Sequence, residues 1–411
     1  IIDIRMEDIM KEKYLVVNCG SSSLKFSLYE MPEEKEIING YVEKIGLEDS
    51  FWTIKMNGEK RSDKRYLKDH TDAVEVMIEE LYKNKVIESL DEIVGIGHRV
   101  LHGGEFYHDS VKIDEEVLER IEGLVKLGPL HLPGEISGIK AMMEKIPGAS
   151  QVAVFDTAFH QTMPKRNYVY ALPYVFYTKY GVRRYGFHGT SHKYITEVMK
   201  EKLGRDEVNL IICHVGSGAS VSCIKNGKCY DTSMGLTPLD GLIMGTRSGE
   251  IDPSIIRYVM KEGEMSIDEV DNIMNKESGL LGICGKSDFR DVVALRDAGN
   301  EQATLAYEMY MDAIIKHIGE YYFELNGHVD AIVFTAGVLE NNAMLRKDII
   351  NEMRDIMNIE VNDSVNDNIG YGHDFKEGII TTNESKIPFY VVPTSEEIMI
   401  ARDTYRITKG N

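Results

Sequence analysis

Positively charged residues are scarce in this chain relative to acidic ones. Its 411 residues include 47 Lys and Arg against 67 Asp and Glu, which gives a formal net charge of −20. A field of this sign repels nucleic acid and anionic membrane surfaces. Any anionic ligand must therefore be met by cations gathered locally or by a metal ion.

Long apolar runs and a secretory leader are also missing. No stretch approaches the roughly 18 apolar residues that span a bilayer. The opening segment, Ile1 to Lys13, is acidic and mixed, without a basic start and an apolar stretch. We expect neither a membrane span nor a signal peptide, and Met6 and Met10 are candidate natural starts.

Cysteine is rare and odd in number, which argues against a disulfide framework. The five residues lie mostly in apolar, strand-like runs, and this is typical of reduced, buried thiols in a cytoplasmic protein. Cys223 and Cys229 could in principle join a metal site, but no second Cys/His pair has the spacing of a zinc site. The cysteines are Cys19, Cys213, Cys223, Cys229 and Cys284.

Two familiar phosphate-binding motifs are absent. The chain has no Gly-x-x-x-x-Gly-Lys-Ser/Thr loop, and no Gly-x-Gly-x-x-Gly follows a strand and opens a helix. The sequence therefore argues against P-loop and dinucleotide-binding architectures.

The chain instead contains a Gly/Ser hairpin, and this hairpin occurs twice. Leu15–Tyr29 reads as a strand, a Gly/Ser turn and a returning strand whose tip exposes backbone N–H groups, hydroxyls and an ammonium. Ile211–Ile224 aligns with it without a gap, with Asn18 over His214 and Gly20 over Gly216. Two such phosphate cradles predict a duplicated domain with a nucleotide between the halves.

Strand and helix signals alternate along the chain, which predicts an α/β protein with mixed sheets. The length suits two domains of roughly 150 to 230 residues. No Pro/Gly/Ser linker separates them, so we expect a packed hinge near Phe159. We place the first domain at residues 10–159, with a helix from about 397 to 411 returning to it, and the second at 160–396. Expected strands are 37–45, 51–56, 93–98, 152–155 and 331–334, and expected helices are 72–83, one from about 193 and one ended by Gly327.

Several polar side chains follow predicted strands, where α/β proteins bind ligands. Arg99 and Arg247 lie in Gly-rich loops, and such guanidinium groups bind carboxylate or phosphoryl oxygens in a bidentate way. His188 and His131 are the histidines best placed to meet an anion. Surface exposure is the ordinary alternative for any one of these groups.

Asp156 and Glu396 are the carboxylates that we expect to serve a metal. Mg²⁺ binds phosphates through one or two protein carboxylates plus water, so sparse candidates suffice. The ordinary alternatives are capping of the next turn for Asp156 and a favourable helix-dipole position for Glu396.

Two long motifs resemble the signatures of the acetokinase (acetate kinase) family. Asn18–Phe26 is similar to one signature and Arg184–His192 to the other. Val154–His160, Met244–Pro253 and Phe334–Gly337 follow in the order of that family, and the resemblance covers about residues 14 to 405. It implies duplicated actin-like (ribonuclease H-like) domains with a cleft between them, as in actin, sugar kinases and heat-shock chaperone ATPases.

The resemblance also implies roles for particular residues. Asn18 and Glu396 would hold Mg²⁺, and Arg99, Asp156, His188 and Arg247 would form the reaction centre. Ser21, Ser23 and Lys25 would face phosphate. The ATP or ADP site would comprise His214, Val215, Gly216, Ser217, Gly218, Asp288, Phe289, Arg290, Gly337, Val338, Leu339, Glu340 and Asn341. The acyl pocket would comprise Arg99, Leu101, Leu130, His131, Phe187 and Pro238.

The implied activity is reversible, Mg²⁺-dependent phosphoryl transfer from ATP to acetate, directly and in line, by a cytoplasmic homodimer without nucleic-acid or membrane partners. Ser217 and Leu339 depart from the family pattern, and Leu339 replaces a glycine that would let a nucleotide approach. Pyrophosphate therefore stays open as the donor. Leu101, larger than the usual valine, leaves propionate open as the acceptor. A non-catalytic nucleotide switch is the alternative from another class.

Overall fold

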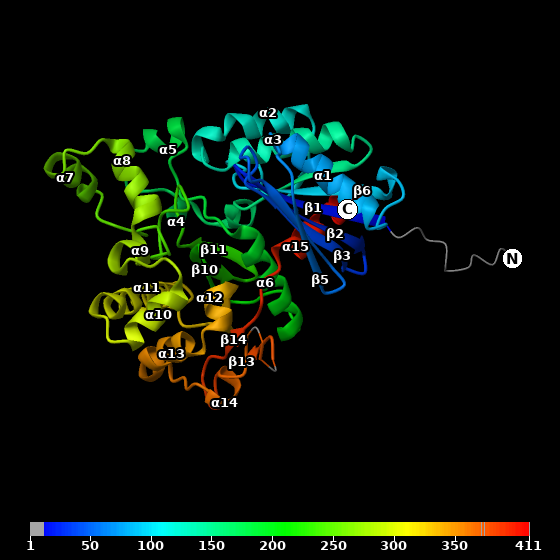
Figure 1. Cartoon of the computed structure of the whole chain (residues 1–411). Coiled ribbons are helices and arrows are strands. Elements are labelled where there is room, and N and C mark those ends of the chain that lie inside the picture. Colours follow the sequence, from blue (N-terminus) through cyan, green and yellow to red (C-terminus); the bar gives the residue numbers. More distant parts are fainter. Residues whose placement is uncertain (1–11, 371, 374, 411) are drawn as a thin grey trace. The chain divides into compact units, whose positions relative to one another are not determined.

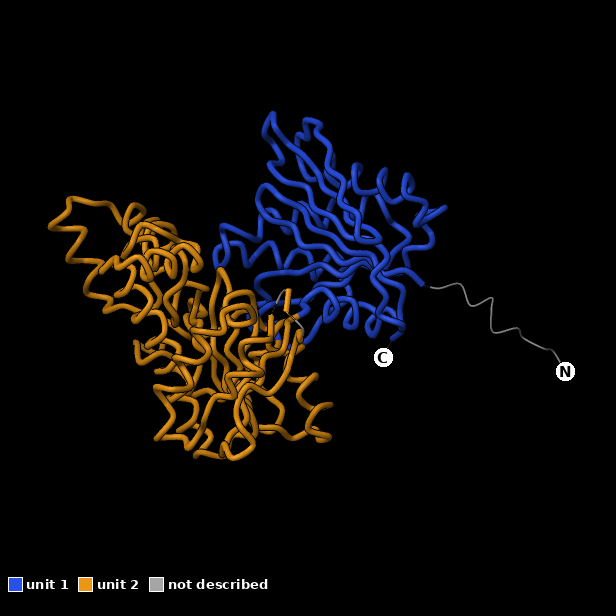
Figure 2. The backbone as a smooth tube through the Cα atoms, turned by 60° about the horizontal axis from the view of Figure 1, so that its bottom comes forward, with its two compact units in different colours: residues 1–158, 395–411 blue, residues 159–394 orange. Residues whose placement is uncertain are grey.

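The computed structural model describes residues 12–370, 372–373 and 375–410. The chain divides into two compact units (Figure 2). Unit 1 comprises Ile1–Ala158 and Ser395–Asn411, and unit 2 comprises Phe159–Thr394. The opening segment, for which we expect no signal peptide, lies outside the described residues up to position 11. That each unit is a domain with the predicted limits stays a prediction.

Unit 1 is built on one mixed sheet with the strand order β5-β4-β3-β2-β1-β6-β8-β7. Strands β1 to β5 form an antiparallel meander, and β1, β6 and β8 run parallel. The strands are β1 Glu12–Cys19, β2 Ser23–Met31, β3 Lys35–Glu43, β4 Phe51–Met56, β5 Glu59–Lys64, β6 Ile93–Val100, β7 Val111–Lys112 and β8 Ser150–Phe155. The helices are α1 His70–Lys83, α2 Glu115–Gly123, α3 Leu132–Lys145 and α15 Glu396–Thr408, with short turns Leu90–Glu92 and Val125–Leu127.

Alternation along β1 and β2 sends side chains to opposite faces of this sheet, because the side-chain period of a strand is two. Leu15, Val17 and Leu24 pack with α1 and α3 on one face. Tyr14 and Val16 pack with Ile400 of α15 on the other. The central strands of the sheet are thus buried between helices on both faces (Figure 1).

Two glycines of β6 let α15 lie close to the sheet. A Cβ on Gly97 would stand 2.1 Å from Thr404 Oγ1 and 2.6 Å from Ile400 Cγ2, and one on Gly95 would stand 2.9 Å from Thr408 Oγ1. Only hydrogen fits at these positions. This close approach brings Glu396, the first residue of α15, to the end of β6 where Arg99 lies.

Unit 2 holds a second mixed sheet with the order β11-β10-β9-β12-β14-β13. Its strands are β9 Leu210–Val215, β10 Ala219–Lys225, β11 Lys228–Thr232, β12 Ala331–Thr335, β13 Gly378–Ile379 and β14 Phe389–Val391. Its helices are α4 Lys165–Tyr168, α5 Val175–Tyr180, α6 Gly189–Leu203, α7 Ser254–Glu262, α8 Ile267–Asn272, α9 Gly279–Cys284, α10 Phe289–Asp297, α11 Glu301–Glu324, α12 Ala336–Asn341, α13 Ala343–Met357 and α14 Asp363–Asn366. A short turn spans Ala158–Thr162, and a π-helical turn, Ile273–Glu277, follows α8.

The two sheets repeat one topology. In each, an antiparallel meander is followed by two parallel strands and a short antiparallel edge strand. Strands β1, β2, β3, β6, β8 and β7 match β9, β10, β11, β12, β14 and β13, and β4 and β5 extend the meander of unit 1 alone. Mixed sheets flanked by helices are what the alternating sequence signals predict, and this prediction is confirmed.

The gapless alignment of the two hairpins is wrong on the returning strand. Asn18 pairs with Lys25 across the first hairpin, whereas His214 pairs with Ser220 across the second. The tip of the first hairpin is therefore one residue longer, and Ser220 occupies the place of Lys25. A short polar tip has no hydrophobic pattern to reveal such an insertion.

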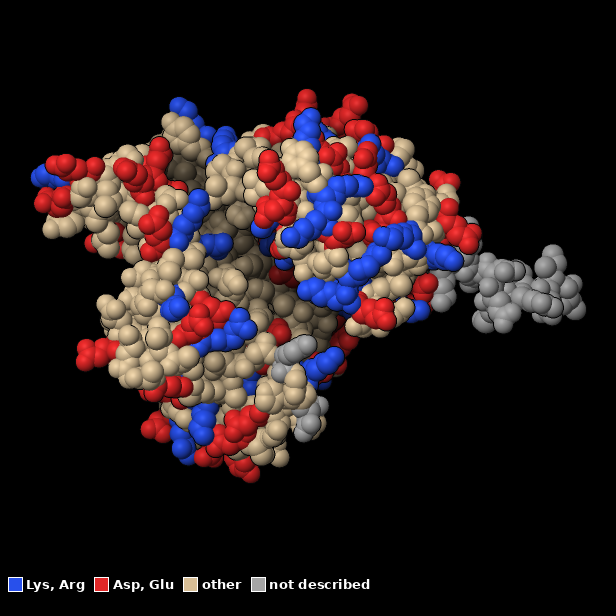
Figure 3. Space-filling model, in the orientation of Figure 1, with Lys and Arg blue, Asp and Glu red and all other residues tan. Residues whose placement is uncertain are grey.

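Several predicted elements occur with shifted ends. Helix α6 begins at Gly189, four residues before the expected start near Lys193, because packing of Thr190 and Ser191 overrides their weak helix propensity. All five cysteines carry free thiols, and four of them are buried. Within the described ranges no helix is both long and apolar enough to cross a bilayer. Acidic and basic side chains are interspersed on the face in Figure 3.

Candidate active site

The tip of the β1–β2 hairpin exposes two hydroxyl side chains on a fixed backbone. Gly20 N–H donates to Ser23 O at 2.8 Å, and His70 Nε2 lies 2.8 Å from Gly20 O. Ser21 and Ser22 are exposed. Gly134 of α3 packs so tightly that a Cβ there would lie 2.5 Å from Gly20 O. Sheet and helix therefore hold the tip in one conformation.

Arg99, at the end of β6, and Asp156, directly after β8, form a bidentate ion pair. Arg99 Nε donates to Asp156 Oδ1 at 3.1 Å, and its NH2 donates to Oδ2 at 2.8 Å. Glu396 Oε2 lies 3.8 Å from Arg99 Nε. One guanidinium thus faces two carboxylates, and Asp156 raises the pKa of Arg99 above its ordinary value. The three predicted residues come together at the carboxyl end of the sheet.

A third carboxylate, which the sequence analysis missed, lies behind this cluster. Glu135 of α3 is 6% exposed, and its Oε2 accepts a hydrogen bond of 2.9 Å from Leu101 N–H. Burial raises the pKa of Glu135 to about 8, with Asp156 adding to the rise and Arg99 opposing it. Its position one turn into a helix gave no signal that it reaches the end of β6.

A cavity of about 480 Å³ opens beside the cluster within unit 1. Asn18, Lys25, Arg99 and Glu396 are among the residues that line it. Burial raises the pKa of Glu396, with Asp156 adding to the rise and Arg99 opposing it. An amide oxygen, a carboxylate and two cations beside one cavity suit a metal ion bound together with an anion. Within the described part of the chain no three His, Cys, Asp or Glu residues form a metal cluster of their own.

The acyl-pocket residues of unit 1 differ in exposure. Leu101 is buried at 6% exposure, and a Cβ on Gly128 would stand 2.8 Å from its Cδ2. Leu130 is 57% exposed and His131 is exposed as the N-cap of α3. The other members, Phe187 and Pro238, belong to unit 2. That these residues form one pocket stays a prediction.

The tip of the β9–β10 hairpin of unit 2 lies beside an imidazole and a guanidinium group. A Cβ on Gly218 would stand 3.1 Å from His188 Nε2 and 3.7 Å from Arg247 NH1. His188 adopts a left-handed backbone (φ 56°) as the N-cap of α6. Such a conformation is strained for a residue with a side chain and is frequent at functional positions. The structure thus brings together His188 and Arg247, the two predicted reaction-centre residues of this unit.

Arg247, unlike Arg99, is not paired with a carboxylate in the described part of the chain. Its NH1 donates to Pro238 O at 3.3 Å and lies 3.5 Å from Met244 Sδ. Burial lowers the pKa of Arg247 from its ordinary value, yet a guanidinium stays charged in proteins. A half-buried cation without a counterion is a ready partner for an anionic ligand.

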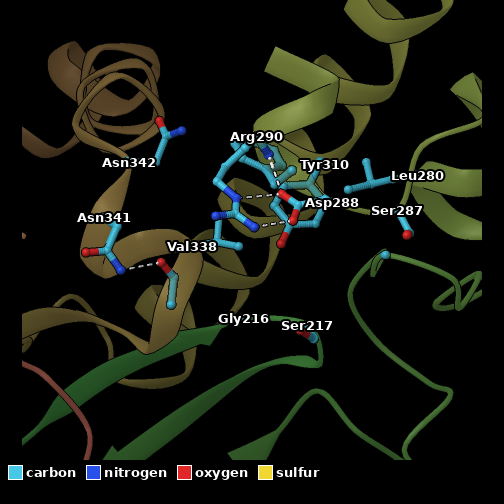
Figure 4. A pocket seen from close by; sticks show the side chains of 13 residues that line it. Gly216, Ser217, Leu280, Ser287, Asp288, Arg290, Tyr310, Val338, Asn341 and Asn342 are labelled. Carbon is cyan, nitrogen blue, oxygen red and sulfur yellow. Dashed lines mark hydrogen bonds and ion pairs between the residues drawn. The ribbon is translucent and has the colours of Figure 1, made fainter. Parts of the chain in front are cut away.

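A cavity of about 510 Å³ begins at the same hairpin (Figure 4). Asp288 and Arg290 stand on one wall, where Arg290 Nε and NH2 donate to Asp288 at 3.0 and 2.6 Å. Asn341 Nδ2 donates to Gly337 O at 2.8 Å on another wall. The lining residues are Gly216, Ser217, Gly245, Leu280, Ser287, Asp288, Phe289, Arg290, Tyr310, Gly337, Val338, Asn341 and Asn342.

Most nucleotide-site candidates line this cavity, and some do not. The sequence analysis expects Leu339 to hinder the approach of a nucleotide. Its side chain has no exposed surface and lies in the core, so it does not obstruct the cavity. Glu340 Oε1 accepts from Ala336 N–H at 2.7 Å and from Thr394 N–H at 3.0 Å, which is a structural role. Val215 is fully buried as well.

The remaining differences concern the hairpin and the far wall of the cavity. Gly218 and His214 lie at the hairpin outside the lining set, His214 with its ring stacked on His188 at 4.3 Å. Five lining residues were missed: Gly245, Leu280, Ser287, Tyr310 and Asn342. Tyr310 belongs to the apolar face of α11, and the spacing of that face predicts that Tyr310 is buried but not that it lines a cavity.

Each unit presents its own set of charged and polar groups around a cavity. Unit 1 offers a guanidinium held by carboxylates next to the side chains of Asn18 and Lys25. Unit 2 offers an uncompensated guanidinium and an imidazole beside Gly218, on the hairpin whose Gly216 and Ser217 line a cavity with apolar, amide and hydroxyl groups. Such groups stabilise negative charge on transferring phosphoryl oxygens.

Known proteins share this chain's sequence and structure. It matches the model of the Acetokinase family over residues 13–402. It is 47% identical over 403 residues to the acetate kinase of Finegoldia magna, which covers 97% of this chain and 100% of that protein. The solved acetate kinase of Porphyromonas gingivalis matches with a TM-score of 0.90 at 45% identity, over 96% of this chain and 99% of that one. A propionate kinase from Francisella tularensis subsp. tularensis SCHU S4 matches with a TM-score of 0.90 at 41% identity, over 96% and 100% of the two chains.

Proposed function

Since this chain belongs to the acetokinase family, we propose that it transfers a phosphoryl group reversibly between ATP and acetate, giving acetyl phosphate and ADP. Its membership makes it a phosphotransferase with a carboxyl group as acceptor and confirms the predicted duplicated actin-like fold. The observation that supports the proposal best is that the cavity and two predicted reaction-centre residues adjoin the same hairpin tip in unit 2. Gly216 and Ser217 line the cavity, while His188 and Arg247 lie beside Gly218.

The nucleotide occupies the cavity of unit 2 in this proposal. Phe289, Leu280 and Val338 supply apolar contacts for a base, and the exposed guanidinium of Arg290, oriented by Asp288, is placed to stack on its face. The phosphates then extend toward the N–H groups of Gly216 and Ser217. The terminal phosphoryl group thereby reaches His188 Nε2 and Arg247.

Acetate needs no general base, because its carboxyl group has a pKa near 4 and is ionised at neutral pH. Asp156 supports this reasoning, since both of its oxygens are occupied by Arg99. We assign Asp156 to orienting Arg99, and Arg99 and Arg247 to neutralising the anions on either side of the migrating phosphoryl group. His188 donates a hydrogen bond to the same group.

The residues of unit 1 fit Mg²⁺. Asn18 and Glu396 line one cavity with an amide and a carboxylate oxygen, and Mg²⁺ typically takes one or two protein ligands plus water and phosphate. Bound there, the ion would neutralise charge on the phosphates. Lys25, Ser21 and Ser23 supply donors at the neighbouring hairpin.

A hydroxylamine trap tests the activity. The protein is incubated with acetate, Mg·ATP and hydroxylamine, and we expect acetohydroxamate to accumulate with ADP. Absence of hydroxamate together with retained ATP binding would favour a nucleotide switch.

The main reason to consider pyrophosphate as the donor was that Leu339 would obstruct a nucleotide. The Leu339 side chain is buried, so we expect ATP to saturate the reaction and pyrophosphate to support little turnover.

Propionate is the second acceptor to test, because one solved relative bears the name propionate kinase. Leu101 is one methylene larger than the usual valine, and such a difference changes discrimination by about 1 to 3 kcal/mol. We propose acetate as the preferred acid. A higher kcat/KM with propionate would reverse this preference.

We further propose a cytoplasmic homodimer that associates through unit 2. Helix α7 has no buried residue in the single chain, and its Ile255 and Tyr258 are 45% and 68% exposed. Phe176 and Tyr180 of α5 are 40% and 56% exposed. Exposed apolar side chains in such number are typical of protein interfaces. Light scattering should give twice the chain mass of 46.5 kDa, and Tyr258→Glu should shift it toward the monomer.

A further inference from the structure

A line of hydrogen bonds runs from His188 into the core of unit 2. His188 Nδ1 lies 2.9 Å from Ser220 Oγ on β10, and the same hydroxyl lies 2.8 Å from His192 Nε2 on α6. The other nitrogen of His192, Nδ1, lies 2.7 Å from Ser222 Oγ. Ser220, Ser222 and His192 have no exposed surface. The mechanism above uses only His188 of these four.

The strand period explains why these groups meet. Ser220 and Ser222 are two apart on β10, so they share the face of the sheet that packs against α6. His188 and His192 are four apart, which places both on the helix side that faces them. The four side chains therefore alternate in space as Ser222, His192, Ser220 and His188.

Proton counting along this line leaves few arrangements. His192 is neutral, because burial and the neighbouring His160 and His214 lower its pKa well below the ordinary value. One ring nitrogen of a neutral imidazole donates and the other accepts, and a serine hydroxyl has one proton to donate. If His192 Nε2 donates to Ser220, then Ser220 donates to His188 Nδ1. The remaining proton of His188 then lies on Nε2, next to Gly218 and Arg247.

The opposite arrangement would place a proton on His188 Nδ1. His188 would then either lack a proton on Nε2, and repel phosphoryl oxygens, or be a cation. Arg247 faces His188 from the adjoining loop, the His214 ring of β9 stacks on it at 4.3 Å, and neutral His192 lies behind it. Arg247 repels a second positive charge.

We propose that Ser222, His192 and Ser220 are positioning residues that hold His188 as its neutral Nε2–H tautomer, so that Nε2–H is aimed at the phosphoryl group. The proposal rests on the proposed phosphotransferase function for its consequence. The tautomer can be measured without catalytic turnover. A histidine's second ring nitrogen commonly fixes which tautomer is present.

Two measurements test it. In protein labelled with ¹⁵N-histidine at neutral pH, with the His188 signals identified by their loss in His188→Gln, we expect an unprotonated Nδ1 and a protonated Nε2. Ser220→Ala should shift His188 toward a mixture of tautomers, and Ser220→Thr, which keeps the hydroxyl, should restore the original signals. A wild-type His188 protonated at Nδ1 would overturn the proposal whether or not the protein is active.

Kinetics give the second readout. Ser220→Ala should lower kcat about 10- to 100-fold, as is typical when the partner that orients a functional histidine is removed, with KM for ATP changed less than about twofold. Ser220→Thr should recover most of kcat. Cys223→Ala is the matched control, because Cys223 is equally buried on the same strand and faces the other side of the sheet. Equal losses in Ser220→Ala and Cys223→Ala, or wild-type kcat in Ser220→Ala, would refute the positioning role.

Discussion

The ends of the two sheets share a topology and differ in charge. In unit 1, β6 ends in Arg99, which faces the carboxylates of Asp156 and Glu396. By register the same place in β12 is Thr335, and the cation of unit 2 is Arg247, supplied by a loop and paired with no carboxylate in the described part of the chain. A duplicated scaffold thus provides equivalent positions, and the residues at the strand ends give one unit a guanidinium paired with carboxylates and the other unit a guanidinium that is unpaired within the described residues.

Removing the uncompensated cation should have the largest effect on activity. We expect Arg247→Ala to lower kcat about a hundredfold or more, because roughly 3 kcal/mol of transition-state stabilisation is lost with such a group. Arg247→Lys keeps the charge without the bidentate fork and should fall between. Steady-state kinetics measure both variants. Arg354→Ala, on the exposed surface of unit 2, is the control, and wild-type turnover in Arg247→Ala would sink the assignment.

Removing the compensated cation should affect stability as well. Arg99→Ala leaves Asp156, which is 1% exposed, without its counterion, and losing one partner of a buried ion pair costs roughly 3 kcal/mol. Arg247→Ala should cost little, because no buried charge loses its partner. Urea unfolding compares the two, with Arg120→Ala as the exposed ion-pair control. Equal stability of Arg99→Ala and wild type would show that the charge contrast between the units is not real.

The buried carboxyl group of Glu135 in unit 1 makes the stability of the protein depend on pH. Its pKa is raised to about 8 in the folded state, so its contribution to stability is present below the unfolded value near 4.5 and is lost as pH rises toward 8. Glu135→Gln lacks this titration. Relative to that variant, the wild type should lose about 2 kcal/mol of unfolding free energy between pH 6 and pH 8.

The control for this experiment is Glu144→Gln, an exposed carboxylate on the same helix. It should follow the wild type across the whole range. Asp231, whose pKa burial raises to about 7, titrates in all three proteins and cancels in the differences. A constant gap between wild type and Glu135→Gln from pH 6 to pH 8 would contradict the buried, protonated carboxyl.

Much of the scaffold follows from local patterns. The hairpins, β6, β8 and β12 were predicted because alternating or short apolar runs end in polar residues, and the grouping of Arg99 with Asp156 follows from parallel strands ending at one edge. What could not be predicted depends on tertiary packing. The orientation of Leu339 into the core is set by how α12 packs, and the burial of Glu135 by how closely α3 lies against the hairpin.

The line of hydrogen bonds from His188 to Ser222 could be predicted from the sequence only in part. The period of two in β10 and of four in α6 is readable in the sequence, and both periods are typical of residues that share a face. Their pairing requires α6 to lie on β9 and β10, and to begin at Gly189 instead of near Lys193. No single-sequence pattern contains that register.

ATP titration by calorimetry in the absence of Mg²⁺ tests most directly that the nucleotide belongs to unit 2. Gly337 lines the cavity, and a Cβ there would have no atom within 4 Å, so Gly337→Leu adds an apolar side chain at a position with open space around its Cβ. Glu396→Gln removes the carboxylate that we propose as a Mg²⁺ ligand in unit 1. The account predicts loss of ATP binding in Gly337→Leu and an unchanged dissociation constant, within about twofold, in Glu396→Gln. Undiminished ATP binding by Gly337→Leu would contradict it.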